Sequence, residues 1–127
     1  MKVHGKSALG LDPNIAAGWA YVWPCAIGLF MSVIILVTDK SNKLARFHAF
    51  QSLLLFAVAF VVYIVFSIVG FAVSGINVEA VSTLVQGLYV VYVILVLAAV
   101  IFCCIKAFLG QIFKLPVIGN MADNWSN

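Results

Sequence analysis

Residues 47–78 read FHAFQSLLLFAVAFVVYIVFSIVGFAVSGINV, a stretch without one Asp, Glu, Lys or Arg. A helix needs about 20 mostly apolar residues to cross the hydrocarbon core of a bilayer. Every backbone N–H and C=O in that core must find its partner within the segment, so an apolar run of this length forms a helix. A β-barrel strand would alternate polar and apolar residues, whereas residues 53–58 (LLLFAV) are apolar on both faces. The stretch therefore predicts a membrane-spanning helix.

Two further windows without a charged side chain flank this stretch, at residues 13–38 and 80–105. Both are long enough to span a bilayer. We therefore expect an all-α fold, an integral membrane helical bundle with three transmembrane helices in a single transmembrane domain, residues 1–127. The helices are expected at about residues 14–37, 47–74 and 80–108. Pro24 is expected to kink the first of them.

The composition excludes other classes of protein. Of the 127 residues, 65% are hydrophobic and 9% are charged, against about 25% charged in soluble domains. Seven Lys and Arg and four Asp and Glu cannot coat a soluble globule, and a disordered chain would be poor in apolar residues. The net charge of +3 comes without a long basic cluster, so we expect no nucleic-acid partner.

The C-terminal stretch 111–119 (QIFKLPVIG) is apolar but too short to span, and it contains Pro116 and Gly119. It predicts a short interfacial or re-entrant segment.

Basic residues predict the orientation, because Lys and Arg collect on the cytoplasmic side. With three spans, the first loop and the C-terminal tail share one side, and the second loop contributes only Glu79 to the other. The basic residues of the shared side are Lys40, Lys43, Arg46, Lys106 and Lys114. This predicts an outside N-terminus and a cytoplasmic C-terminus in a prokaryotic inner membrane, with anionic lipid headgroups as partners of the basic side chains.

The entry to the second helix carries the most unusual polar group. His48, Gln51 and Ser52 are spaced i, i+3, i+4 and share one helix face. They are either an interhelical hydrogen-bond anchor or a contact for a translocated substrate, a lipid headgroup or a partner helix. The candidate contact residues are Lys43, Arg46, Phe47, His48, Gln51 and Ser52.

A second polar group, Ser82, Thr83 and Gln86, lies early in the third helix. Intramembrane amides and hydroxyls often bridge helices, so these residues predict interhelical hydrogen bonds, with a pore lining as the alternative.

The sequence offers no catalytic constellation. No span contains a carboxylate, so a paired-carboxylate site or an acidic proton relay cannot be built there. A lone His48 does not make a metal site, which needs several ligands. We expect no enzyme activity, no metal and no cofactor.

Several stretches carry a resemblance to a known family. They are LDPNIAA at 11–17, NKLARFHAFQS at 42–52, KAFLGQ at 106–111 and FKLPVIGN at 113–120. They resemble small prokaryotic membrane proteins of unknown function that are similar to the channel subunit of the chloroplast inner-envelope translocon (TIC), a group that includes MamF-like magnetosome proteins. The resemblance implies a helical bundle without enzyme activity, with roles in protein translocation, compartment assembly or scaffolding, often in an oligomer.

These observations favour a non-enzymatic membrane protein that acts as a scaffold or translocation-related subunit, as a homo-oligomer or with other membrane proteins. Two alternatives stay open: a small oligomeric ion or solute channel, and an accessory subunit of a larger membrane complex.

Overall fold

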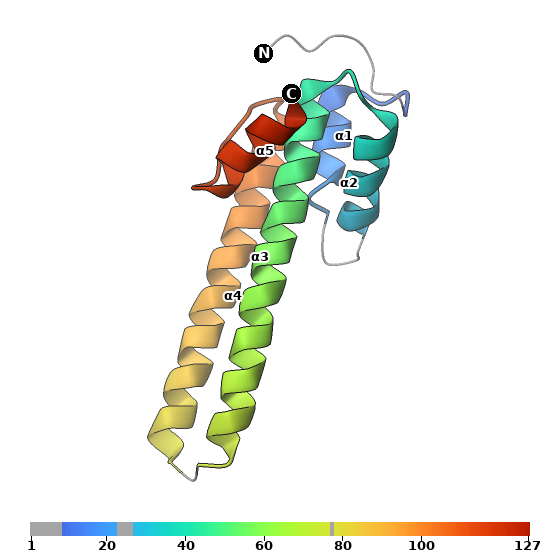
Figure 1. The fold of residues 1–127 in the computed structure, drawn as a ribbon. Coiled ribbons are helices and arrows are strands. Elements are labelled where there is room, and N and C mark those ends of the chain that lie inside the picture. Colours follow the sequence, from blue (N-terminus) through green and yellow to red (C-terminus); the bar gives the residue numbers. More distant parts are fainter. Residues whose placement is uncertain (1–8, 23–26, 77) are drawn as a thin grey trace. The chain divides into compact units, whose positions relative to one another are not determined.

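The computed structural model describes residues 9–22, 27–76 and 78–127, and this part of the chain is all-helical. It forms helices α1 (Pro13–Trp19), α2 (Ile27–Thr38), α3 (Lys43–Ser74), α4 (Glu79–Phe108) and α5 (Ile118–Ser126) (Figure 1). The kink expected at Pro24 lies outside the described residues.

Two of the described helices are long and apolar enough to cross a membrane, α3 with 32 residues and α4 with 30. They occupy the two later windows that the sequence assigned to spans. The third predicted span is not formed by the described residues. Instead of one helix over 14–37 the chain forms α1, with seven residues, and α2, with twelve. Twelve helical residues rise about 18 Å, short of the ~30 Å hydrocarbon core.

Helices α1 and α2 pack against each other as a hairpin. The N–H of Gly28, early in α2, donates to the carbonyl of Val22, just after α1, at 2.7 Å. One turn further on, Ser32 Oγ donates to Ala20 O at 3.4 Å and to Gly28 O at 2.7 Å. The first apolar window therefore folds back on itself.

The carbonyl of Ala20 explains why one long helix is unfavourable here. A proline at position 24 has no N–H, so a continuous helix would leave the carbonyl four residues earlier without its partner. In the structure Ala20 O accepts from Ser32 Oγ and, at 2.5 Å, from Ser52 Oγ of α3. Two hydroxyls replace the missing donor and tie α2 and α3 to the end of α1.

The hairpin brings the start of α1 to the end of α4. A Cβ atom added at Gly110, which has φ +69°, would lie 2.8 Å from Asn14 Oδ1. The start of α3 lies at the same level, because His48 Nε2 is 3.1 Å from Gln111 O. In the structure residue 14 therefore lies at the same end of the first unit as loop 39–42, whereas the three expected spans would place residue 14 and this loop on opposite sides of a membrane.

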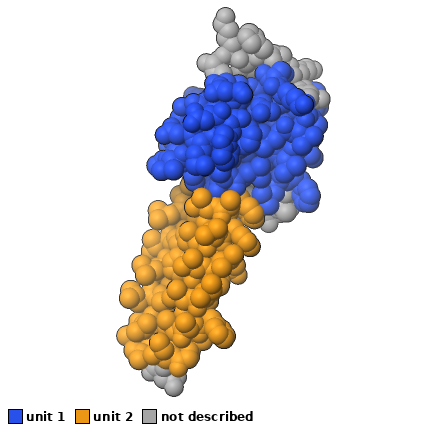
Figure 2. Space-filling view, in the orientation of Figure 1, with its two compact units in different colours: residues 1–55, 100–127 blue, residues 56–99 orange. Residues whose placement is uncertain are grey.

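The chain divides into two compact units (Figure 2). The first, residues 1–55 and 100–127, holds the buried core. Small side chains dominate that core, which lets the helix backbones approach closely. Its fully buried alanines are Ala16, Ala17, Ala20, Ala45, Ala49, Ala107 and Ala122.

The second unit, residues 56–99, contains the remaining turns of α3 and α4. Rings join the two helices: Phe66 has its centroid 5.6 Å from that of Tyr89 and 5.5 Å from that of Tyr92. Tyr92 Oη also donates to Ala59 O at 2.5 Å. Ala59 is the one buried residue among those described in this unit. The apolar side chains of the second unit therefore face mostly outward.

The hairpin predicts which residues share a side of the membrane. In a variant whose cysteines at 25, 103 and 104 are replaced by alanine, Leu9→Cys and Lys40→Cys should react with a membrane-impermeant maleimide from the same side. Ser74→Cys, at the far end of α3, should react from the opposite side. If Leu9→Cys and Lys40→Cys label from opposite sides, residues 13–38 cross the membrane and the hairpin is wrong.

Candidate functional site

Helix α3 begins at a side-chain cap. Asn42 Oδ1 accepts from Ala45 N at 3.3 Å, and Asp39 Oδ1 accepts from Asn42 N at 3.1 Å. An asparagine that bonds the third residue beyond it is a typical N-cap. Because of this cap, α3 begins at Lys43, four residues before the predicted boundary. His48, Gln51 and Ser52 therefore lie within its first three turns.

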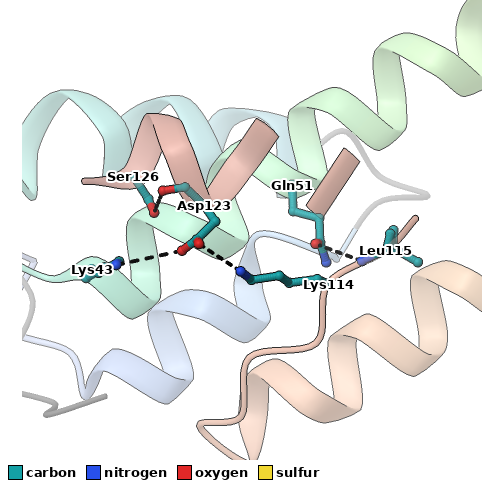
Figure 3. A network of polar contacts seen from close by, with 6 residues as sticks. All are labelled: Lys43, Gln51, Lys114, Leu115, Asp123 and Ser126. Atoms are coloured by element: carbon teal, nitrogen blue, oxygen red, sulfur yellow. Dashed lines mark hydrogen bonds and ion pairs between the residues drawn. The ribbon is translucent and has the colours of Figure 1, made fainter. Parts of the chain in front are cut away.

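Gln51 is the centre of the site and is fully buried. Its Nε2 donates to Tyr21 Oη and to the carbonyl of Phe113, both at 3.0 Å. Its Oε1 accepts from the N–H of Leu115 at 3.3 Å (Figure 3). Both ends of the amide are therefore used inside the chain.

His48, one turn earlier, is also fully buried. A carbonyl oxygen only accepts, so the 3.1 Å contact of His48 Nε2 with Gln111 O places the ring proton on Nε2. Nδ1 is then the acceptor for the hydroxyl of Tyr21, at 3.2 Å. Tyr21 Oη in turn accepts from Gln51, which closes the network.

The backbone groups that His48 and Gln51 bond belong to every second residue of one segment. His48 bonds the backbone of residue 111, and Gln51 bonds the backbone of residues 113 and 115. Alternate residues present their backbone groups to one side in an extended chain. Two side chains of α3 thus hold the non-helical segment 111–115 by its backbone, much as a neighbouring strand would.

Arg46 bonds the end of α2. Its Nη1 donates to the carbonyl of Leu36 at 3.5 Å and to that of Asp39 at 3.4 Å, and its guanidinium lies 5.7 Å from the ring centroid of Phe50. The last carbonyls of a helix lack helical partners and carry partial negative charge, which a cation stabilises. Arg46 therefore holds the hairpin to α3.

The candidate contact residues differ in exposure. Phe47, His48 and Gln51 are fully buried, and Ser52 is 3% exposed. The polar side chains of His48, Gln51 and Ser52 form hydrogen bonds to other segments of the chain, which is the kind of contact that the anchor alternative predicts. Lys43 is the exception, with a side chain 41% exposed.

Asp123 of α5 joins two lysines on the surface (Figure 3). Its carboxylate lies 2.7 Å from Lys114 Nζ and 3.7 Å from Lys43 Nζ. The hydrogen bond from Lys114, aided by the charge of Lys43, lowers the pKa of Asp123 below its usual value. These ion pairs connect α5 to the start of α3.

The second polar group does not bridge helices within the chain. Ser82 Oγ donates to Glu79 O in its own helix, at 2.9 Å. Thr83 and Gln86 make no side-chain hydrogen bond to any described residue. The expected interhelical bonds are therefore absent among the described residues.

The described residues contain no group of three His, Cys, Asp or Glu side chains that could hold a metal ion.

The chain is similar to archaeal membrane proteins over nearly its whole length. A UPF0132 membrane protein of Methanocaldococcus jannaschii is 31% identical over 125 residues, which cover 96% of each chain. The chain belongs to the UPF0132 family. UPF0132 membrane proteins of Archaeoglobus fulgidus (26% over 113 residues) and of M. jannaschii (a second one, 29% over 120 residues) are also similar, and the matches cover 94% and 73% of their chains.

No protein-family model and no solved structure matches the chain. The UPF0132 relatives are named as membrane proteins, and α3 and α4 are long enough to cross a bilayer, so this is a membrane protein.

Part of the site of this UPF0132 protein was not predicted from the sequence. The hydrogen bonds of the Tyr21 hydroxyl and of the backbone of 111–115 were not expected, although the stretches NKLARFHAFQS and FKLPVIGN both stand out in the sequence. The available signal was that both stretches carry polar residues in an otherwise apolar chain, so each needs a partner.

Gln51→Leu should destabilise the protein strongly. The change leaves Phe113 O and Leu115 N without their partner, and each buried unpaired group costs about 1–3 kcal/mol. We expect a loss of about 3 kcal/mol or more in the free energy of unfolding, measured by thermal or denaturant unfolding in detergent, with faster proteolysis within 111–117. Gln111→Ala is the matched control, because the Gln111 side chain bonds only the exposed Lys106. Equal stability of the two variants would contradict the anchor.

The attachment of α5 should depend on pH through Asp123. A lowered pKa means that the ion pairs stabilise the folded state fully above the ordinary carboxyl range, near pH 4, and that this contribution is lost as the pH falls through the lowered pKa. Trp125 packs on Phe50 at 5.9 Å, so its fluorescence, with Trp19 and Trp23 replaced by Phe, should change below about pH 4. Asp123→Asn should abolish this transition. An identical acid transition in Asp123→Asn would contradict the assignment.

Proposed function

We propose that this UPF0132 protein is a non-enzymatic integral membrane protein that works through helix–helix assembly, as a scaffold or a translocation-related subunit. The supporting observation is that the rest of the chain buries only a small share of the two long apolar helices, α3 and α4. Only 6% of the most apolar window of α3 and 11% of that of α4 are buried. Side chains such as Phe71, 84% exposed, and Ile68, 64% exposed, face outward. Such surfaces are available to lipid and to other helices.

The polar site supports a structural role rather than a chemical one. The amide of Gln51 and both ring nitrogens of His48 are bonded to backbone or to Tyr21, and all three side chains are buried. A substrate would have to break these bonds to reach them. We therefore propose that the face anchors the segment 111–115 and has no catalytic function.

The translocation part of the proposal rests on the resemblance of residues 42–52 and 113–120 to the proteins similar to the TIC channel subunit. The structure adds one supporting fact, that these two motifs bond each other through Gln51. Partners of the helices are other copies of the chain or other membrane proteins.

We further propose that the basic end of the first unit faces the cytoplasm and anionic lipid headgroups. Its basic residues are Lys40, Lys43, Arg46, Lys106 and Lys114. Cytoplasmic surfaces of membrane proteins are enriched in Lys and Arg. With the hairpin in place, this orientation puts residue 14 as well as residue 127 on the cytoplasmic side. Lys40→Cys labelled from outside intact cells would reverse it.

Assembly predicts a complex in the native membrane. The protein should be extracted with its lipids in polymer-bounded nanodiscs and weighed by native mass spectrometry. A homo-oligomer or a defined complex with other proteins is expected, and a lone monomer would overturn the proposal. Purified protein in liposomes should not conduct across a range of voltage and pH. A reproducible conductance would favour the channel alternative instead.

A further inference from the structure

A groove lies between α3 and α4 in the second unit and has a volume of about 320 Å³. Its wall on α3 includes Tyr63, Ser67 and Gly70, which are spaced i, i+4, i+7 on one helix face. Its wall on α4 includes Gln86 and Tyr89. A Cβ atom added at Gly70 would meet nothing within 4 Å, so the groove stays open at a position that a larger side chain would fill.

Three polar side chains of the groove have no hydrogen-bond partner among the described residues. They are the hydroxyls of Tyr63 and Tyr89 and the carboxamide of Gln86. Ser67 differs from them, because its Oγ donates to Tyr63 O at 2.9 Å. Both helices therefore contribute unpaired polar groups to one groove.

These unpaired groups lie at the depth of the hydrocarbon core when α3 and α4 span the bilayer. Glu79, the first residue of α4, is charged and belongs at the membrane surface. Gln86 is about 10 Å along the axis from there, and Tyr63 is about 17 Å from the end of α3 at Ser74. The headgroup layer is only about 5–8 Å thick. An amide or a phenol below that layer needs a partner, and lipid tails offer none.

The lining residues indicate the chemistry of an occupant. No charged side chain is among the described residues that line the groove, so a neutral molecule fits. The rings of Tyr63, Phe66 and Tyr89 offer surfaces on which a planar ring can pack. Small-molecule sites are mostly apolar clefts of about 300–1,000 Å³ with a few polar groups. The groove lies at the lower end of that range, which suits a single small ring.

We propose that the groove binds the ring of a lipid-soluble quinone, a neutral planar molecule with two carbonyl oxygens on opposite sides. These oxygens accept from the hydroxyl of Tyr63 on α3 and from Gln86 or Tyr89 on α4, while the apolar tail stays in the surrounding lipid. A lipid acyl chain would fill the same space but leave all three polar groups unpaired. The site binds a ligand without reaction and goes beyond the helix assembly proposed above, on which it does not depend.

The first test locates the site by photo-cross-linking in lipid nanodiscs. A short-tailed benzoquinone that carries a photoactivatable azide should label peptides that contain Tyr63 or Tyr89, and the labelling should saturate. The unmodified benzoquinone should displace the label, whereas an alkane of the same tail length should not. Labelling that does not saturate, or displacement by the alkane, would overturn the proposal, because the groove would then hold apolar tails without regard to the ring.

Two glycines give a matched pair of variants. A Cβ atom added at Gly70 or at Gly87 meets nothing within 4 Å, but of the two only Gly70 lines the groove. Gly70→Leu should therefore abolish saturable labelling, and Gly87→Leu should label like wild type. Both exchanges favour a helix, so both variants should keep the circular dichroism of the wild type. Equal labelling of the two variants would overturn the site.

The third test examines the hydrogen bonds one at a time. Tyr63→Phe and Gln86→Leu should each weaken the binding of the unmodified benzoquinone about three- to fifteenfold, the range expected for one intramembrane hydrogen bond. Tyr92→Phe is the control and should bind like wild type, because the Tyr92 hydroxyl already bonds Ala59 O and does not line the groove. Unchanged binding in both Tyr63→Phe and Gln86→Leu would overturn the proposal. Release of another membrane protein by Gly70→Leu would identify a partner helix as the occupant and would overturn it as well.

Discussion

Burial of the Gln51 amide is the constraint on which the first unit depends. A primary amide in an apolar interior is costly unless its donor and acceptor atoms are bonded. Gln51 meets this requirement with a ring at the end of the hairpin, Tyr21, and with the backbone of Phe113 and Leu115. Two segments distant in sequence are thereby held to one side chain of α3. The position of α5 follows, because Lys114 lies between these two bonded residues and forms the ion pair with Asp123.

The same physical rule shapes the N-terminal hairpin. In a membrane a helix can be interrupted only where other groups take over the freed backbone partners. Ser32 and Ser52 do this for the carbonyl of Ala20, and Arg46 does it for carbonyls at the end of α2. The polar residues at the start of α3 that bond backbone groups are Arg46, His48, Gln51 and Ser52. Their presence in an apolar chain is explained by the backbone groups of neighbouring segments that they bond.

The two compact units differ in how their polar side chains are bonded. In the first, side-chain amides, hydroxyls and the imidazole are paired inside, which makes a self-contained core of small residues. In the second, the hydroxyls of Ser67 and Ser82 bond carbonyls of their own helices and Gln86 has no hydrogen-bond partner among the described residues, while nearly all side chains face outward. A UPF0132 protein with this division has one part that keeps its fold and another whose surface is left for lipid or for other helices. That contrast underlies the assembly function that we propose.

Helices α3 and α4 were predictable, and their observed bounds differ from the expected ones by at most four residues. Apolar length is a local property that decides a spanning helix without tertiary information. The shared face of His48, Gln51 and Ser52 was equally predictable, because it depends only on the helical period. Membership in the membrane class and the absence of a soluble core followed from composition.

Two features were decided only by tertiary structure. Residues 13–38 form an uncharged window that is long enough to span a bilayer. The window nevertheless folds back, because the carbonyl of Ala20 finds its donors 12 and 32 residues away. The role of Gln51 likewise depends on backbone groups more than 60 residues along the chain. The sequence by itself determined which segments are apolar enough for a membrane and which residues share a helix face. Only the folded chain decided which polar groups meet, because hydrogen-bond partners are selected by distance in space and not by local pattern.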